Sequence, residues 1–327
     1  SRALVAANEV KASILNHTEF KTFAQTAIDL FHGWKDQVKL TEIFTAEEQG
    51  YESPKDIIHR ISEALLSAYA NASLLDKYDI YQIIMDYWAE SMQDDVYVIT
   101  QDGWQAGKPL RELVVKKGEK LKETADLVIN KTKYKAELIP PALMVAKFFA
   151  DEKAAIDELQ AKLDASTQEL ESYIEEHATE DGLLIDATTD AGKVTKATVA
   201  ARLKEANLKA ADTDELNALK TVKKLIETEA ANKKALKDAQ DTLDKHVFEQ
   251  YPQLTTAQIQ TLIVDDKWLA TLQASIKAEI ERITQQLANR IKTLEERYSE
   301  PMPTLVDNVA TLSDKVDEHL KKMGLAW

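Results

Sequence analysis

The chain of 327 residues contains no cysteine, and this absence removes several kinds of chemistry. Disulfide bonds, thiol nucleophiles and thiolate metal sites are excluded, and the composition fits a reducing compartment. The sequence also lacks an apolar run of the roughly 18 residues that a membrane-spanning helix requires, and no signal-peptide pattern opens it. We therefore expect a soluble, cytoplasmic protein that does not enter a membrane.

The sequence motifs that usually carry catalysis are also missing. There is no Gly-x-x-x-x-Gly-Lys phosphate loop, no Gly-x-Gly-x-x-Gly nucleotide loop and no Gly-x-Ser-x-Gly nucleophile elbow. None of the six histidines lies within four residues of another, which disfavours a metal site. Neighbouring carboxylates such as Asp94-Asp95 and Asp265-Asp266 fall where helix ends or turns are expected. The sequence therefore predicts no catalytic, cofactor-binding or metal-ligating residue in this chain.

Glycine and proline are scarce, with 8 and 7 residues, and good helix formers such as alanine, leucine, lysine and glutamate dominate. The sequence predicts a mainly α fold with an N-terminal helical module, a small β insertion, and then long antiparallel helices that resemble a coiled coil. Residues 1–137 are expected to form the helical module, with a small sheet near residues 96–116. Residues 138–327 are expected to form a long-helix bundle for subunit assembly.

Helical periodicity and capping residues organise the first part of the chain. An amphipathic pattern from Val10 is expected to end near Gly33, and Ser53-Pro54 marks the start of another helix, with serine as N-cap and proline as first helical residue. The segment Lys77–Ile99 carries an aromatic-rich helical stripe that Asp94-Asp95 is expected to close. The β-prone stretches Val96–Thr100 and Arg111–Lys116 are predicted to be strands.

The second part of the chain has the apolar spacing of long helices. Phe149, Ile156, Leu163 and Leu170 recur every seven residues and indicate a coiled-coil seam, which Asp181-Gly182 is expected to end. A further long helix is expected to run to Val247, followed by a short helix after Thr255 or Thr256. The last long helix is expected to bury a stripe of period about 3.6, and a returning helix follows Pro303. The stripe comprises Leu269, Leu272, Ile276, Ile280, Ile283, Leu287, Ile291, Leu294 and Tyr298.

The formal net charge of −15 argues against a protein that coats nucleic acid uniformly. Two stretches, residues 100–135 and 193–209, are nevertheless net positive. They have two interpretations: local contact with phosphate groups, or ordinary solvated faces.

Several stretches share a pattern with a known protein family. The more specific motifs are Tyr78-Asp79-Ile80-Tyr81, Gln93-Asp94-Asp95-Val96-Tyr97 and Lys267-Trp268-Leu269. The longer stretches are Glu9–Trp34, Lys77–Ile99, Leu138–Asp164, Asp266–Tyr298 and Leu305–Leu325. Together they resemble the C-terminal part of the modification subunit of type I restriction-modification DNA methyltransferases. The resemblance covers most of the chain in the same order and is weak between Glu169 and Asp265.

The resemblance implies a non-catalytic region of a longer polypeptide whose methyltransferase core precedes Ser1. In that family two modification subunits join one specificity subunit, and a restriction subunit completes the full complex. The assembly methylates N6 of adenine in double-stranded DNA with S-adenosylmethionine as cofactor. This chain lacks the family's glycine loop and its Asn/Asp-Pro-Pro-Tyr/Phe motif, since Pro140-Pro141 is flanked by Ile139 and Ala142. We therefore expect no bound cofactor and no methyl transfer by this chain, but assembly with the specificity subunit and closure around DNA.

Two sets of residues are candidates for these contacts. The expected partner-binding residues are Leu287, Ile291, Leu294 and Leu312. The residues expected to touch DNA phosphates are Lys116, Lys117, Lys193, Lys196 and Arg202.

Two alternatives stay open at the level of sequence. The first is a free-standing coiled-coil scaffold or structural protein without a nucleic-acid role. The second is an enzyme with an unrecognised carboxylate site, which ranks lower because no stretch gathers titratable groups around a glycine-rich loop.

Overall fold

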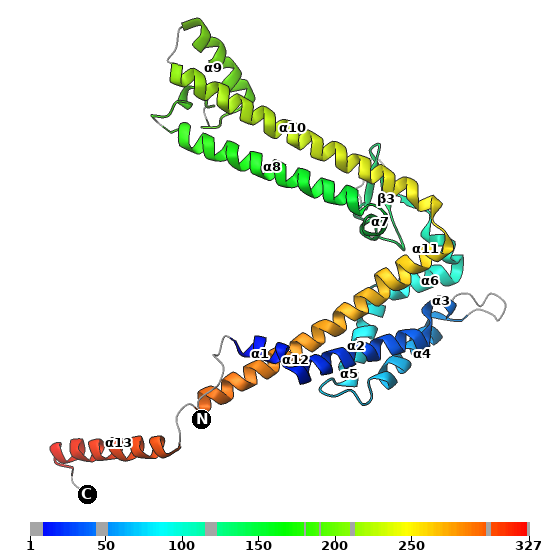
Figure 1. The fold of residues 1–327 in the computed structure, drawn as a ribbon, viewed down its shortest axis with the longest axis vertical. Helices are drawn as coiled ribbons and strands as arrows, with labels where there is room; N and C mark the ends of the chain where they lie inside the picture. Colours follow the sequence, from blue (N-terminus) through cyan, green and yellow to red (C-terminus); the bar gives the residue numbers. More distant parts are fainter. Residues whose placement is uncertain are drawn as a thin grey trace. The chain divides into compact units, whose positions relative to one another are not determined.

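The computed structural model describes residues 9–43, 52–114, 123–179, 181–189, 191–209, 213–298 and 302–325. It confirms a mainly α fold with one small antiparallel sheet (Figure 1). The chain divides into two compact units, one of Ser1–Gly103 with Val264–Trp327 and one of Trp104–Ile263. This division differs from the expected boundary after residue 137, because the C-terminal helices belong with the N-terminal module.

The first unit combines helices from both ends of the chain. Helix α12 (Ala270–Arg297) packs against α1, α2 and α5. It directly follows the π-helical segment η5 (Thr261–Leu269), within which the boundary between the two units falls. The other elements are α1 (Val10–Asn16), α2 (Thr18–Val38), α3 (Leu40–Ile43), α4 (Pro54–Ala68), α5 (Lys77–Tyr87), π-helical η1 (Trp88–Met92), α6 (Gln93–Asp102) and α13 (Met302–Lys322).

Two local predictions in this unit fail because tertiary burial overrides local propensity. Helix α2 continues through Gly33 to Val38, with Phe31 and Trp34 buried on either side of the glycine. The predicted strand at Val96–Thr100 is helical, and Asp94-Asp95 does not close a helix but begins α6. Val96 and Ile99 are both buried, so this segment follows a helical period despite its β-prone residues. Helix α6 ends instead at Gly103, whose φ of 73° suits glycine.

Predicted capping is confirmed at α4. The Ser53 hydroxyl accepts a hydrogen bond from the backbone N–H of Asp56, and Pro54 is the first helical residue. The core beneath this helix includes two buried aromatic side chains with satisfied polar atoms. The indole N–H of Trp34 donates to the carbonyl oxygen of Ile61 at 3.0 Å, and the Tyr69 hydroxyl donates to that of Ala27 at 2.6 Å. Burial raises the pKa of Tyr69.

A buried polar cluster joins the two ends of the chain within this unit. Asp95, only 4 % exposed, accepts hydrogen bonds from the Lys267 ammonium at 2.6 and 2.9 Å. It also accepts one from the indole N–H of Trp268 at 2.7 Å. Burial raises the pKa of the Asp95 carboxyl, and the positive charge of Lys267 and the two donors act in the opposite direction. The cluster fixes α6 against η5 with a charge pair that is costly to break.

The second unit begins with a three-stranded sheet of order β1-β3-β2. Its strands are β1 (Arg111–Glu112), β2 (Leu127–Ile129) and β3 (Thr132–Lys135), all antiparallel. Asn130 and Lys131, between β2 and β3, both have positive φ, as a tight type I′ hairpin requires. A small sheet is thus present, but only Arg111–Glu112 of the predicted strands belongs to it among the described residues.

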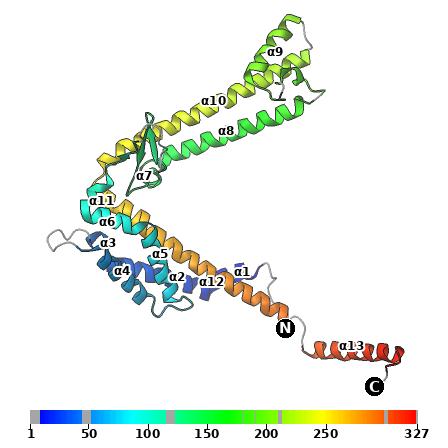
Figure 2. The same ribbon diagram turned by 180° about the vertical axis from the view of Figure 1, so that it is seen from behind.

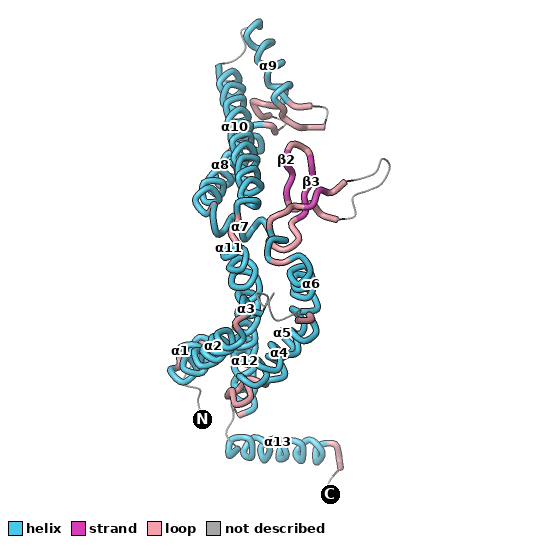
Figure 3. Tube along the Cα trace, turned by 90° about the vertical axis from the view of Figure 1, so that its right-hand side faces the viewer, coloured by secondary structure: helices cyan, strands magenta, loops and turns pink. Residues whose placement is uncertain are grey.

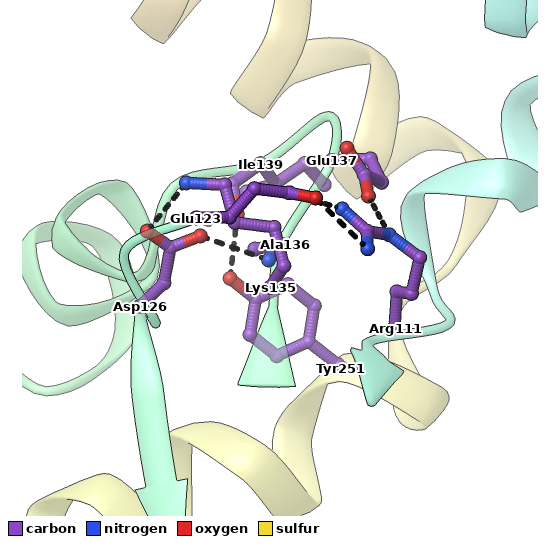
Figure 4. A network of polar contacts seen from close by, with 8 residues as sticks. All are labelled: Arg111, Glu123, Asp126, Lys135, Ala136, Glu137, Ile139 and Tyr251. Atoms are coloured by element: carbon purple, nitrogen blue, oxygen red, sulfur yellow. Dashed lines mark hydrogen bonds and ion pairs between the residues drawn. The ribbon is translucent and has the colours of Figure 1, made fainter. Parts of the chain in front are cut away.

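Ion pairs and hydrogen bonds hold the edges of this sheet (Figure 4). Arg111 pairs with Glu123 and Glu137, and Lys135 pairs with Asp126 at 2.9 Å. The second oxygen of the Asp126 carboxylate accepts the backbone N–H of Ala136 at 2.9 Å. After the sheet, the Tyr251 hydroxyl donates to the carbonyl oxygen of Ile139 at 2.5 Å.

The rest of the second unit is dominated by two long helices, α8 (Ala150–His177) and α10 (Thr213–Gln250), which lie side by side in Figures 1 and 2. Glu152 contacts His246, and Ser166 contacts Asn232, so the helices are antiparallel. Strand β2 packs against α10, and Figure 3 shows the β2–β3 hairpin in magenta beside this helix. The remaining elements are 3₁₀-helical η2 (Trp104–Gly107), η3 (Ile185–Ala187) and η4 (Tyr251–Gln253), with α7 (Pro141–Phe148), α9 (Lys196–Lys209) and α11 (Thr256–Gln260).

Several local predictions for the helices of the second unit are confirmed. The α8 seam buries Ile156 and Leu170, and the helix ends at His177 before Gly182. A Cβ atom at Gly182 would lie 2.2 Å from the carbonyl oxygen of His177, so this tight reversal needs glycine. Thr255 caps α11 with a complete capping box. The helix after it is not separate, however, because α11, η5 and α12 follow one another without a break.

We predict that Asp95→Ala lowers the free energy of unfolding of the first unit by about 3–5 kcal/mol, because the largely buried Lys267 ammonium would lose the carboxylate that compensates its charge. Urea denaturation followed by tryptophan fluorescence measures this loss. The control is Asp94→Ala at the exposed neighbouring position, with an expected change below about 0.5 kcal/mol. The double variant Asp95→Leu with Lys267→Met should be more stable than Asp95→Ala. Equal losses for Asp94→Ala and Asp95→Ala would contradict a stabilising role for the pair.

Candidate assembly surface

Helix α12 carries two apolar stripes with different surroundings. The first is buried along one face and comprises Leu272, Ile276, Ile280, Thr284 and Ala288. The second comprises Leu287, Ile291 and Leu294 in the C-terminal half of the helix and Tyr298 at its C-cap, which are 37–62 % exposed. The prediction that the helix buries its whole stripe is therefore wrong for these four residues. We call them the α12 stripe.

Helix α13 is amphipathic, yet its apolar face is open. Leu305, Val309, Leu312 and Val316 recur at intervals of three or four residues and are all exposed, and Leu320 is partly buried. A single helix of this length is marginally stable in water unless its apolar face packs against another surface. The α13 face therefore requires a covering surface.

A groove of about 310 Å³ begins where the α12 stripe ends. Leu287 lines it together with Ile14 of α1, Phe20 and Phe23 of α2, and Leu74 of the loop before α5. Leu74 has a φ of 61° and is 64 % exposed. The left-handed conformation costs a non-glycine residue roughly 1–2 kcal/mol. A strained loop thus presents a leucine side chain to solvent at the edge of an apolar groove.

The predicted partner-binding residues are all accessible. Leu287, Ile291 and Leu294 share the α12 stripe, and Leu312 lies on the open face of α13. A docking role requires that these side chains be accessible, and they are. That they bind a partner together stays a prediction.

The predicted phosphate-contacting residues have different environments. Lys116 and Lys117 lie outside the described residues. Lys193 and Lys196 are exposed at and before the start of α9. Arg202 on α9 contacts Glu215 at 2.6 Å, Asp186 at 2.9 Å and Glu205 at 3.6 Å. Glu215, the nearest carboxylate, raises the pKa of the Arg202 guanidinium above its usual range. Arg202 is thus held by carboxylates of its own unit, and Lys193 and Lys196 are better placed to meet a phosphate group.

The other basic stretch is also partly neutralised. Arg111 and Lys135 both lie in it, and both pair with carboxylates at the sheet (Figure 4). These contacts favour a structural role for the two cations over a nucleic-acid contact.

The described residues contain no group of three or more histidine, aspartate and glutamate side chains arranged to hold a metal ion. Within the same residues, no helix has both the length and the apolar character needed to span a bilayer.

Sequence reasoning missed the groove and the Asp95–Lys267 pair. The pair joins residues 172 positions apart, and no local pattern reports such a contact. The groove gathers side chains from four separate segments. A weak signal existed for one of them, because Leu74-Leu75 is an apolar pair in an otherwise polar turn.

Comparison with known proteins adds no relative: no protein-family model, curated protein or solved structure matches the chain.

We predict that the two stripes of α12 differ in their contribution to stability. Ile276→Ala should lower the free energy of unfolding by about 2–5 kcal/mol, because it empties part of the core. Leu294→Ser should cost clearly less, because the core of the first unit leaves this side chain 37 % exposed. Urea denaturation of the two variants measures both effects. A loss at Leu294 as large as that at Ile276 would mean that the α12 stripe is part of the core in solution.

Proposed function

We propose that this chain is the non-catalytic C-terminal region of the modification subunit of a type I restriction-modification DNA methyltransferase. It assembles with the specificity subunit and helps to close the complex around DNA. The observation that carries this proposal is the α12 stripe, an exposed apolar helical face that continues from a packed core helix. Such a face marks an interaction site in a protein that stays folded in water.

The positions of the family-like motifs support the proposal. The motifs around Asp95 and Lys267 are far apart in the sequence and meet in one buried cluster. Tyr78-Asp79-Ile80-Tyr81 opens α5, where Asp79 pairs with Arg282 of α12 at 3.0 Å. These three specific motifs thus belong to one compact unit, although the longer family-like stretch Leu138–Asp164 belongs to the other.

The partners follow from this assignment. The long helices of the specificity subunit would cover the α12 stripe and the open face of α13 in the manner of a helix bundle. A second modification subunit and the restriction subunit would complete the cytoplasmic assembly. S-adenosylmethionine and the target adenine would bind to the catalytic region of the longer polypeptide, so this chain itself carries no methylation chemistry.

A free-standing coiled-coil scaffold is the second candidate. The antiparallel pair of α8 and α10 favours it, because such pairs serve as rigid spacers in structural proteins. The two functions differ in a simple observable, which is binding to a type I specificity subunit.

We predict that replacing Leu287, Ile291 and Leu294 together by serine weakens binding to the specificity subunit at least about 100-fold, because buried apolar anchors dominate such interfaces. The matched control replaces Gln285, Asn289 and Lys292, exposed on the opposite face of α12, by serine and should bind normally. Isothermal titration of each folded variant gives the affinities. The proposed function is wrong if the unaltered chain does not bind any type I specificity subunit.

Substitution is a sharper test than removal of the residues from Asp266 onward. That deletion would also remove Lys267, Trp268 and the buried residues of α12. Loss of binding would then report an unfolded unit as readily as a lost interface.

We further predict that Lys193→Gln with Lys196→Gln reduces the salt dependence of DNA binding by the assembled complex. If each lysine neutralises one phosphate, the slope of log K against log salt should fall by about 1.8. The control, Lys233→Gln with Lys237→Gln on α10, should leave the slope unchanged. An unaltered slope in the first variant would exclude these lysines from the DNA contact.

A further inference from the structure

The α12 stripe and the open face of α13 are close neighbours in the sequence. Helix α12 ends at Arg297 and α13 begins at Met302, so four residues connect them. A connection of this length is typical of two antiparallel helices that pack as a hairpin. Because the connection is covalent, each face meets the other at an effective concentration in the millimolar range. An external partner must compete with that concentration.

The two faces also match in register. In an antiparallel hairpin centred on the connection, Leu294 lies opposite Leu305, Ile291 opposite Val309, and Leu287 opposite Leu312. All six side chains are apolar and exposed in the structure. From Leu287 to Tyr298 the helix rises about 16 Å, which the first half of α13 can span in the reverse direction.

The second half of α13 would then continue beyond Leu287, where the groove begins. Val316 and Leu320 follow Leu312 on the same face of α13, and the groove offers Ile14, Phe20, Phe23 and Leu74. The exposed Leu74 side chain stands at the edge that such a helix would cover. The groove therefore continues the α12 stripe through Leu287, and its apolar side chains outnumber the polar ones, which are Ser13, His17 and Glu19.

We infer that α13 folds back on α12 and covers the α12 stripe and the groove when this chain has no partner. The helix is thus an intramolecular cover for the surface assigned above to assembly. The closure does not depend on the proposed function. Its role as a regulator of assembly rests on that function, because a specificity subunit would have to displace α13 before it reaches the stripe.

Because the chain contains no cysteine, any disulfide in a double-cysteine variant must come from the two introduced residues. In the full chain, Ile291→Cys with Val309→Cys should form an intramolecular disulfide under mild oxidation, detected by a mobility shift and by mass spectrometry. The control, Lys292→Cys with Thr311→Cys, spans nearly the same length of chain but places both residues on the outer faces of the hairpin. We expect the first pair to cross-link at least about ten times faster than the control.

Three results would overturn the closure. They are equal rates for both pairs, no cross-link in either pair, and disulfide-linked dimers in place of monomers. The last result would mean that a second copy of the chain covers the stripe.

A binding measurement separates the closure from the proposed function. The oxidised Ile291→Cys, Val309→Cys chain should bind a specificity subunit at least about ten times more weakly than the same chain after reduction. Equal binding before and after reduction would exclude α13 as a cover of the assembly surface. If the unaltered chain does not bind, the proposed function fails, and the cross-linking rates still decide the closure.

Discussion

A carboxylate buried to the extent of Asp95 is tolerated only when its charge is compensated, and Lys267 and Trp268 supply that compensation with three hydrogen bonds. The requirement is directional, because the donors must reach the two oxygens of one carboxylate. Residues of α6 and η5 are thereby held in one relative position, although they are far apart in the sequence. The ends of the chain consequently form one unit, and the residues between them form another.

This fixed position determines how the candidate surface is presented. Helix α12 follows η5 directly, so an η5 anchored at Asp95 sets the direction in which α12 leaves the cluster. The buried stripe from Leu272 to Ala288 then packs along the N-terminal helices, and the remaining turns present Ile291 and Leu294 to solvent. A face displayed on a rigid helix loses little conformational entropy on binding, which favours a specific interaction.

The sequence predicted what depends on neighbours along the chain. The helix start at Ser53-Pro54, the seam of α8 and the break before Gly182 follow from capping, period and backbone freedom, and each is present. Segments controlled by distant packing were mispredicted. Val96–Ile99 has the composition of a strand but is helical, because the core around Asp95 demands a helical period there. Leu287 and its neighbours show the same limit, since periodicity says that a face is apolar but not what covers it.

The long helices of the two units differ in how completely their apolar faces are covered, and this difference bears on function. In the second unit, α8 and α10 cover each other along antiparallel faces, so this pair needs no partner to shield its seam. In the first unit the apolar face of α12 extends past its own core, and α13 adds a further open face. A self-sufficient scaffold gains nothing from such a face, which promotes aggregation when left uncovered. A subunit that must join other chains needs it. The contrast within one chain therefore supports the proposed assembly role over free-standing support, with α13 as the cover of the α12 stripe until a partner displaces it.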